Sequence, residues 1–368
     1  MRVLHAPANI GNQPWTLSRA ERRLGLKSDV VCNYSTSFNF KADRVLSAYT
    51  DKSRRARWAR LSFGMTAPFR YKVLHYYFGR SLLAWDDYAP DYQEGHWIYF
   101  RDLKLAKSLG RRIIFTLQGC DVRMAGKSNA RNKTTFCRPN GCSAYASCIS
   151  HLDAARQHFI DKYLPMADRV FYLVPELQHY LPRGEFMPYG NVDLDEIEPV
   201  VREPGFRPRI LHAPSNDSIK GSPQIEAALR ELAGRYAFEY VPVRGLQHAD
   251  AIKLYRSCDL VIDQLLGGWY GGFAVEAMAM GKPVACHMRD KDLSVLPPAM
   301  RDEMPILRIN EDTLVEDLAA ILEARKSWPE IGMRSRRFVE RWHNPDRITR
   351  ALLGVYRDPQ AAFTLDEV

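Results

Sequence analysis

A glycine-rich stretch in the second half of the chain holds the residues best suited to chemistry. It reads GGWYGGFAVEAMAMGKPV from residue 267 onward, and Glu276 lies about one turn into the helix that should follow the glycines. Glycine amides can approach an anion closely, and a helix start adds a favourable dipole. A carboxylate one turn further along suits neighbouring hydroxyls, such as those of a ribose. A plain glycine-rich connection with a solvated Glu276 is the other interpretation, and in isolation it is slightly favoured.

This stretch resembles the donor-binding signature of the retaining nucleotide-sugar glycosyltransferases with the GT-B fold (group 1, family 4-like). The family typically has a Glu, a glycine-rich turn, a second Glu followed by Ala-Met, and a Gly-Lys-Pro-Val strand. The resemblance implies that Glu276 holds the nucleotide ribose, and that the amides of Gly271, Gly272 and Phe273 contact the donor phosphates or sugar. The first Glu of the family falls on Gly268, so recognition of the donor sugar must differ here.

A second stretch, LHAPSNDSIKG, follows the strand expected over residues 209–213 and resembles the first strand and loop of the family's donor domain. The resemblance implies that Lys220 neutralises the donor diphosphate, where a compact cation suits a leaving group that gains charge. The family's partner arginine is absent, and Pro214 lies near its place. Ser215 and Asn216 could donate hydrogen bonds instead. Taken alone, Lys220 is a surface lysine beside a helix.

The first half of the chain has shorter matches to the family. Gly11 and Asn12 follow the first expected strand, where the family has a loop that reaches the donor phosphate. The run FTLQGCD resembles a family strand end that usually reads Phe-His-Gly-x-Asp, with Gln118 in place of the His. Glutamine takes no proton near neutral pH, so Asp121 is the expected ionisable group. His75 ends another strand and could line the cleft, although a packed, hydrogen-bonded histidine is the favoured alternative.

Strands and helices alternate along the chain, which favours parallel sheets covered on both faces. A stretch rich in proline and glycine, residues 183–208, interrupts this pattern and is the best candidate for a linker. We therefore expect an α/β chain of the GT-B class: two tandem doubly wound Rossmann-like domains, residues 1–185 for the acceptor and 186–345 for the donor. A helix in residues 346–368 should return to the first domain. The cleft between the domains is the expected active site.

The overall composition supports a two-domain globular protein. The 368 residues exceed what one core usually fills, and 46 % hydrophobic with 26 % charged residues exclude a disordered or collagen-like chain. The 52 Lys and Arg against 43 Asp and Glu give a net charge of +9, which suits anionic partners. Neither a membrane span nor a secretory leader is recognisable. The expected location is the cytoplasm, with peripheral attachment to the inner face of the membrane as an option.

Residues 52–63 interleave arginines with Trp, Leu and Phe. Such a helix suits an anionic bilayer surface or a lipid-linked diphosphate acceptor. A solvated basic helix that packs its Trp on the core is equally compatible. Nucleic acid is not an expected partner, because no recognised binding module accompanies the basic residues. The residues expected to contact the membrane are Arg54, Arg55, Arg57, Trp58 and Arg60.

Four of the seven cysteines, Cys120, Cys137, Cys142 and Cys148, lie in one segment. Their spacing lacks the two-residue pairs of most zinc sites. Reduced thiols are therefore the favoured interpretation, and a structural metal stays an alternative. Residues 127–140, rich in Asn, Lys and Arg, are expected to form an exposed loop over the site.

These observations together predict a glycosyltransferase that moves a sugar, with retention, from a UDP- or GDP-sugar to the hydroxyl of a glycan or lipid-linked acceptor. Lys220, Asp121 and Gln118 are the expected catalytic residues. No metal cofactor is expected, because cationic side chains and helix amides would take its place. The base would be read by the main chain of residues 242–246, and the biological role would be assembly of a surface polysaccharide or glycolipid.

Two alternatives stay open. Gly268, Pro214 and Gln118 replace three polar residues of the family, so the chain could bind a sugar nucleotide as a regulatory or scaffold protein without turnover. A GT-B enzyme of another reaction, such as a sugar-nucleotide epimerase, is the second alternative. Release of UDP or GDP only in the presence of an acceptor would separate transfer from both.

Overall fold

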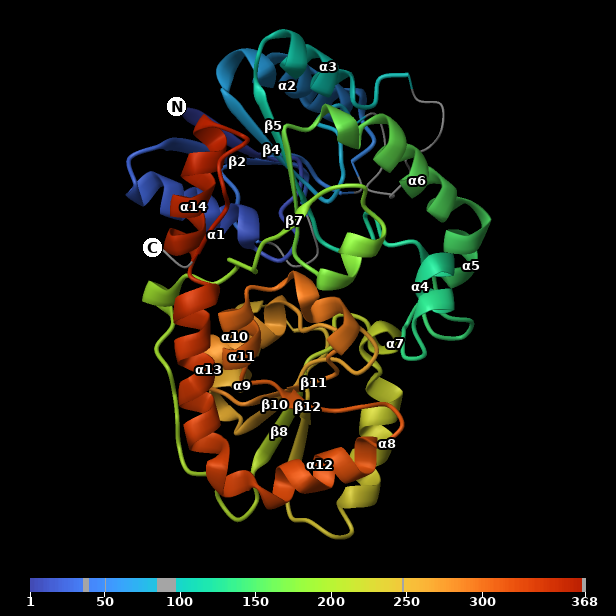
Figure 1. Ribbon diagram of the computed structural model, residues 1–368, viewed down its shortest axis with the longest axis vertical. Helices are drawn as coiled ribbons and strands as arrows, with labels where there is room; N and C mark the ends of the chain where they lie inside the picture. The colour runs from blue at the N-terminus through green and yellow to red at the C-terminus, as the bar shows by residue number, and fades with distance from the viewer. Residues whose placement is uncertain (36–39, 50, 85–96, 247, 366–368) are drawn as a thin grey trace. The chain divides into compact units, whose positions relative to one another are not determined.

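The computed structural model describes residues 1–35, 40–49, 51–84, 97–246 and 248–365 (Figure 1). The chain divides into two compact units. Unit 1 comprises Met1–Met124, Ser147–Asn191 and Pro345–Val368, and unit 2 comprises Ala125–Ala146 and Val192–Asn344. The expected division assigned residues 125–146 to the first domain. In the structure this segment, called the excursion below, groups with unit 2.

Unit 1 is built on a seven-stranded sheet in the order β3-β2-β1-β4-β5-β6-β7, in which every neighbouring pair is parallel. The central strands are buried along almost their whole length, as in parallel sheets that helices cover on both faces. The strands are β1 (Arg2–Ala6), β2 (Lys27–Tyr34), β3 (Arg44–Ser47), β4 (Val73–Tyr77), β5 (Arg112–Leu117), β6 (Arg169–Tyr172) and β7 (Glu185–Phe186).

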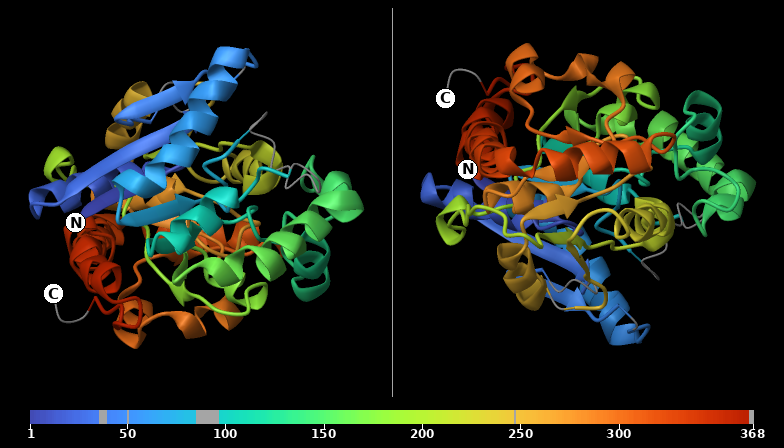
Figure 2. Two further views of the ribbon diagram at one scale, coloured as in Figure 1. Left: turned by 90° about the horizontal axis from the view of Figure 1, so that it is seen from above. Right: turned by 90° about the horizontal axis from the view of Figure 1, so that it is seen from below.

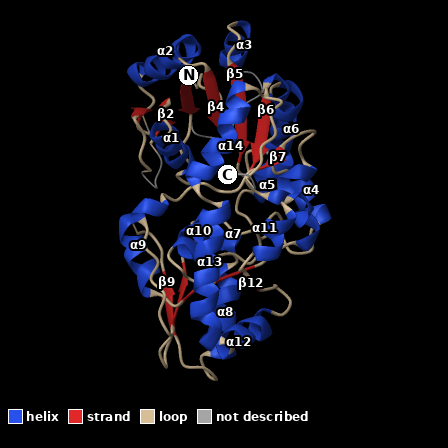
Figure 3. Ribbon diagram, turned by 60° about the vertical axis from the view of Figure 1, so that its left-hand side comes forward, coloured by secondary structure: helices blue, strands red, loops and turns tan. Residues whose placement is uncertain are grey.

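Helices enclose this sheet (Figure 3). The main ones are α1 (Gln13–Arg23), α2 (Arg54–Arg70), α3 (Arg101–Ser108), α6 (Asp153–Lys162) and α14 (Pro345–Arg357). Ser53 caps α2 by accepting a hydrogen bond from the amide of Ala56. The last helix, α14, is far from α1 in sequence but packs against it, and Figure 2 shows α14 in red beside the N-terminus.

Unit 2 has a five-stranded sheet in the order β12-β11-β10-β8-β9, again with parallel neighbours. The strands are β8 (Arg209–His212), β9 (Glu239–Pro242), β10 (Leu260–Ile262), β11 (Val284–Cys286) and β12 (Leu307–Arg308). The helices include α4 (Ala125–Arg131), α7 (Asp217–Lys220), α8 (Ser222–Leu232), α9 (His248–Ser257), α10 (Gly272–Ala279), α11 (Pro298–Glu303), α12 (Leu314–Glu323) and α13 (Trp328–Trp342). Strands β10 and β11 are entirely buried and form the centre of the core.

The alternation of strands and helices in the sequence thus becomes two parallel α/β sheets, which confirms the expected fold class. In both units the loops that follow the strands gather at the carboxyl edge of the sheet, where such folds bind ligands. None of the helices that the structure describes is long and apolar enough to cross a membrane.

Candidate functional site

Three residues from separate segments of the chain meet at the carboxyl edge of the unit 2 sheet. Lys220 ends α7, Asp263 directly follows β10, and Gly271 precedes α10. The Lys220 Nζ lies 2.6 Å from Oδ1 of Asp263, and the amide of Gly271 donates to Oδ2 of the same carboxylate at 2.7 Å. The Asp263 side chain is fully buried and that of Lys220 is 11 % exposed. Lys220 is therefore one half of a buried ion pair, and the interpretation of it as a surface lysine is wrong.

The local backbone explains why Lys220 points at this site. Asn216 caps α7, since its side-chain oxygen accepts hydrogen bonds from the amides of Ser218 and Ile219. Gly221 ends the same helix at φ +77°, a left-handed conformation that favours glycine. The carbonyl of Lys220 accepts from the amide of Leu265 at 2.9 Å, which ties the end of α7 to the loop after β10.

Glu276 lies within α10, one turn beyond Gly272, and is only 8 % exposed. The idea of a solvated Glu276 is therefore wrong. The ring of Phe273 packs on Tyr255 of α9 at 4.8 Å between centroids. Burial, together with the nearby carboxylates of Glu276 and Asp263, raises the pKa of Tyr255. Gly271 is the N-cap of α10. Since glycine has no side chain to cap the helix, Gly271 contributes only its backbone groups at this helix start.

Arg289 occupies the space that a side chain at Gly268 would need. Gly268 has φ +72°, and a Cβ added there would lie 2.5 Å from the Cζ atom of Arg289. The guanidinium is held by Asp292 at 2.9 Å and by the carbonyl of Thr134 at 3.1 Å. A buried arginine from another loop thus lies against Gly268, the position where the resemblance implies a glutamate. Sequence inspection missed Arg289, because it lies 21 positions beyond Gly268 and belongs to no motif.

A second arginine lies beside α7. Arg244, from the loop after β9, pairs with Asp217 at 2.9 Å and with Glu226 at 2.6 Å. These bonds lower the pKa of both carboxyl groups. A positive charge therefore lies beside α7 after all, but two carboxylates balance it.

The excursion of residues 125–146 is held within unit 2 by polar contacts. Arg138 pairs with Glu311 at 3.1 Å and Lys133 with Asp312 at 2.6 Å. The Lys291 Nζ donates to the carbonyl of Arg131 at 2.6 Å. Of the four clustered cysteines, Cys137 and Cys142 lie in this excursion, whereas Cys120 and Cys148 belong to unit 1. All four are free thiols, and within the described residues no group of three or more metal-ligating side chains gathers.

In unit 1, Gly11 and Asn12 follow β1 and both have left-handed backbones, with φ +72° and 65°. Asn12 donates from its side chain to the carbonyl of Asn191 at 3.1 Å. After β5, both oxygens of Asp121 accept backbone amides, from Gln118 at 2.8 Å and Gly119 at 2.7 Å. Burial raises the pKa of this fully buried Asp121. Its carboxyl group orders the loop after β5, and its expected catalytic role stays a prediction.

His75 does not line an open surface. Its Nδ1 lies 2.8 Å from the hydroxyl of Tyr356 and its Nε2 lies 2.7 Å from that of Thr116. The side chain is 1 % exposed, and burial lowers its pKa. Tyr356 in turn donates to Glu21, whose other oxygen lies 2.9 Å from His5. This buried network connects β4 and β5 with α1 and α14. His75 is therefore a packed, hydrogen-bonded histidine, which is the alternative that the sequence favoured over a cleft residue.

Of the residues of the basic helix α2 that were expected to contact a membrane, some are exposed to solvent and one is buried. Arg54 and Arg55 are exposed, and Trp58 is 70 % exposed. Arg60 is buried instead, since it donates to the carbonyl of Ala84 and to the hydroxyl of Ser47. The expectation that Arg60 faces a membrane is therefore wrong, and so is the packing of Trp58 on the core.

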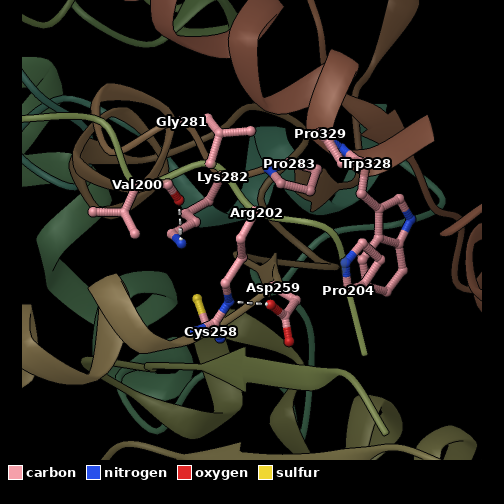
Figure 4. A pocket seen from close by; sticks show the side chains of 11 residues that line it. Val200, Arg202, Pro204, Cys258, Asp259, Gly281, Lys282, Pro283, Trp328 and Pro329 are labelled. Carbon is pink, nitrogen blue, oxygen red and sulfur yellow. Dashed lines mark hydrogen bonds and ion pairs between the residues drawn. The ribbon is translucent and has the colours of Figure 1, made fainter. Parts of the chain in front are cut away.

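A small cavity lies at the opposite, amino-terminal edge of the unit 2 sheet (Figure 4). Lys282 donates to the carbonyl of Val200 at 2.7 Å, and Arg202 pairs with Asp259 at 2.7 Å. The volume of about 10 Å³ leaves room for about one water molecule. This cavity is too small for a nucleotide.

Comparisons with known proteins agree with the class that these two sheets define, which is the GT-B fold. Over nearly their full lengths, solved structures of that fold superpose on the chain. Sucrose-phosphate synthase from Thermosynechococcus elongatus has a TM-score of 0.56 at 13 % identity and covers 97 % of this chain and 98 % of its own. WaaG, a glycosyltransferase involved in lipopolysaccharide biosynthesis, has a TM-score of 0.53 at 13 % identity, with 96 % and 100 % covered.

A UDP-N-acetylglucosamine 2-epimerase candidate from Listeria monocytogenes also superposes, with a TM-score of 0.52 at 15 % identity and 98 % and 97 % covered. Among curated proteins, D-inositol 3-phosphate glycosyltransferase from Saccharomonospora viridis is 30 % identical over 175 residues. That match spans 45 % of this chain but only 38 % of the relative. No protein-family profile matches the chain. At these identities the likeness establishes the fold, which glycosyltransferases and epimerases share.

Proposed function

We propose that this protein is a glycosyltransferase whose donor, a nucleoside-diphosphate sugar, binds at the carboxyl edge of the unit 2 sheet. The observation that supports it best is the cluster of Lys220, Asp263 and Gly271 at the start of α10, with Glu276 one turn further. A buried cation at a helix start suits a diphosphate, and a carboxylate one turn away suits a ribose. The similarity to a curated glycosyltransferase over 175 residues points the same way.

In this proposal the buried Asp263 positions the ammonium of Lys220 without using all three of its hydrogen-bond donors. The remaining donors would bind the departing phosphate and stabilise its growing charge. The bond between the anomeric carbon and the phosphate oxygen breaks, and the acceptor oxygen bonds to the same face of that carbon. The acceptor proton passes to the leaving phosphate. The products are a glycoside of retained configuration and a nucleoside diphosphate, and no protein base or metal takes part.

We assign the acceptor to the carboxyl edge of unit 1, where Gly11 and Gln118 lie in the loops after β1 and β5. The side-chain nitrogen of Gln118 is buried and has no hydrogen-bond partner among the described residues. Such a donor is costly unless something pairs with it, and an acceptor hydroxyl would do so. This assignment gives Gln118 a positioning role that does not require it to take a proton.

We further propose that the protein attaches to the inner face of a membrane and works in the assembly of a surface polysaccharide or glycolipid. Trp58, Met65 and Phe69 lie at positions i, i+7 and i+11 of α2 and are 70, 48 and 62 % exposed. This spacing places them on one side of the helix. Arg54 and Arg55 extend the same helix with positive charge. Apolar side chains flanked by cations suit an anionic bilayer surface.

The function is tested by incubating the protein with UDP- and GDP-sugars, with and without glycan and lipid-linked acceptors. Transfer predicts free UDP or GDP only when an acceptor is present, and the loss of this release in Lys220→Ala and Glu276→Ala. Lys253→Ala, which removes an exposed lysine paired with Asp250, is the matched control and should behave as wild type. An isomerised donor without any acceptor would indicate an epimerase. Binding without release would indicate the scaffold protein.

Membrane attachment is tested by sedimentation with phosphatidylcholine vesicles that contain phosphatidylglycerol. We expect Trp58→Ser with Phe69→Ser to reduce the bound fraction several-fold. Phe206→Ser is the control, because Phe206 is 84 % exposed but lies in unit 2. Equal binding of wild type and the α2 variant would argue against this surface.

The scaffold alternative is favoured by one observation. Arg289 fills the space beside Gly268 where the resemblance implies a sugar-contacting glutamate. A site that holds the nucleotide but lacks this contact would bind a donor without turning it over. The release assay above decides between the two functions.

A further inference from the structure

The amino-terminal edge of the unit 1 sheet has a basic residue at the start of five adjacent strands. These residues are Lys27 of β2, Arg2 of β1, Lys72 directly before β4, Arg112 of β5 and Arg169 of β6. Neighbouring strands lie about 4.8 Å apart, so the backbones of these five residues follow one another across this end of the sheet. Arg2 pairs with Asp29 and Arg169 with Glu185. Within the described residues, no carboxylate pairs with Lys72 or Arg112.

A groove of about 550 Å³ opens at this edge. Its charged lining consists of Lys72, Arg112 and Arg357, and its described lining includes no acidic residue. Leu24, Leu26 and Leu353 supply apolar surface beside them. The volume lies in the range of sites for small molecules. The lining therefore suits an amphiphile with an anionic head.

Helix ends explain only part of this charge. α1 and α14 both end beside the groove, and cations at helix carboxyl ends are favourable there. That effect accounts for Arg357, the last residue of α14. Lys72 and Arg112 precede or begin strands, so no helix end explains them. Nor does it explain Leu24, a large apolar side chain that is 36 % exposed at the same place.

The exposed face of α2 ends close in sequence to Lys72 of the groove. Phe69 and Arg70, the last two residues of that helix, are exposed and come shortly before Lys72 in the chain. Arg111 donates to the carbonyl of Pro68 at 2.7 Å, which fastens the end of α2 to the start of β5. From Trp58 to Phe69 the helix rises about 16 Å. Phe69, the last exposed apolar residue of α2, is three positions before Lys72 of the groove.

We propose that this groove binds the phosphate headgroup of an anionic membrane phospholipid. The phosphate lies among Lys72, Arg112 and Arg357, and the glycerol and the first part of the acyl chains lie on Leu24 and its apolar neighbours. The groove would hold one lipid specifically, whereas the α2 surface contacts the bilayer as a whole. This site is separate from the donor site and does not depend on glycosyl transfer.

The test uses dihexanoyl phosphatidic acid below its critical micelle concentration, titrated into the full-length protein by calorimetry. We expect one site, and at least tenfold weaker binding in the triple variant Lys72→Gln, Arg112→Gln, Arg357→Gln. The matched control replaces three exposed arginines of unit 2, in Arg235→Gln, Arg301→Gln, Arg334→Gln, and should bind as wild type. If the triple variant does not fold, Lys72→Gln and Arg357→Gln alone should each weaken binding about threefold or more, since both side chains are exposed.

Two further ligands distinguish the source of the phosphate. Dihexanoyl phosphatidylcholine, which is neutral overall, should bind at least tenfold more weakly than the phosphatidic acid. Inorganic phosphate should also bind more weakly, and Leu24→Ser should weaken lipid binding but not phosphate binding. Equal affinity for phosphate and lipid would overturn the lipid assignment. Absence of any site, or equal binding in the triple variant and wild type, would overturn the groove itself.

Discussion

Lys220 has two roles in this account, since it pairs with Asp263 and is proposed to bind the donor phosphate. Replacement of Lys220 by methionine removes both. The fully buried carboxylate of Asp263 would lose the ammonium that lies 2.6 Å away. Removal of one partner of a buried ion pair costs about 3–5 kcal/mol, and the slight exposure of Lys220 favours the lower end. A loss of about 3 kcal/mol corresponds to a decrease of roughly 6–12 °C in the unfolding temperature of a domain of 150–250 residues. Donor binding should be lost as well.

The double variant Lys220→Met with Asp263→Asn provides the control. Both charges are then absent, and the asparagine oxygen still accepts from the amide of Gly271. Replacement of a whole buried pair is often close to neutral, so stability should return to within about 1–2 kcal/mol of wild type. Donor binding should not return. Calorimetric scans with and without UDP- and GDP-sugars measure both properties. A wild-type unfolding temperature in Lys220→Met, or a donor-dependent increase in that variant, would refute the reasoning.

Three other predictions concern the fold around the sites. Burial lowers the pKa of His75 below its ordinary 6.5, so below that pH the unfolded chain takes up a proton that the folded chain excludes. Urea unfolding should show stability falling from pH 7 to pH 5, by up to about 1.4 kcal/mol per pH unit for each such histidine, and a flat profile would contradict this. Gly268→Ala forces a Cβ onto a guanidinium at positive φ and should cost at least about 1–2 kcal/mol, whereas Gly205→Ala, in open space, should be neutral in the same assay. Asp121→Ala should lower stability by about 1–3 kcal/mol, because two backbone amides lose their acceptor. If Asp121 only orders the loop, the variant should leave the pH dependence of transfer unchanged, whereas a shifted pH profile would support the catalytic role.

The fold could be predicted from the sequence because it rests on local patterns. Strands such as β5 and β10 are short apolar runs, and the helices between them follow ordinary start and stop signals. Alternation of the two implies parallel sheets, since a parallel connection requires a crossover. The excursion of residues 125–146 could not be predicted in this way. Its place in unit 2 depends on ion pairs such as that of Arg138 with Glu311, which are 173 residues apart.

The site was predictable only where a motif held it. Lys220 and Glu276 belong to recognisable stretches, and the structure places both at the carboxyl edge of one sheet. Asp263 pairs with Lys220, and Arg289 fills the space at Gly268. The two come from separate loops, and neither belongs to a recognisable sequence motif. The place of Asp263, directly after an apolar strand, was the signal that the sequence offered for it. The burial of His75 likewise depends on Tyr356, which is 281 residues away.

The central claim is that a sugar nucleotide binds where Lys220, Asp263 and Gly271 meet. The most direct test measures amide hydrogen exchange in the full-length protein, alone and with each of a panel of UDP- and GDP-sugars. The account predicts that one donor slows exchange in residues 216–221 and 264–276, and that Lys220→Met with Glu276→Ala abolishes this protection. Protection confined to other segments, or none with any donor, would contradict the account.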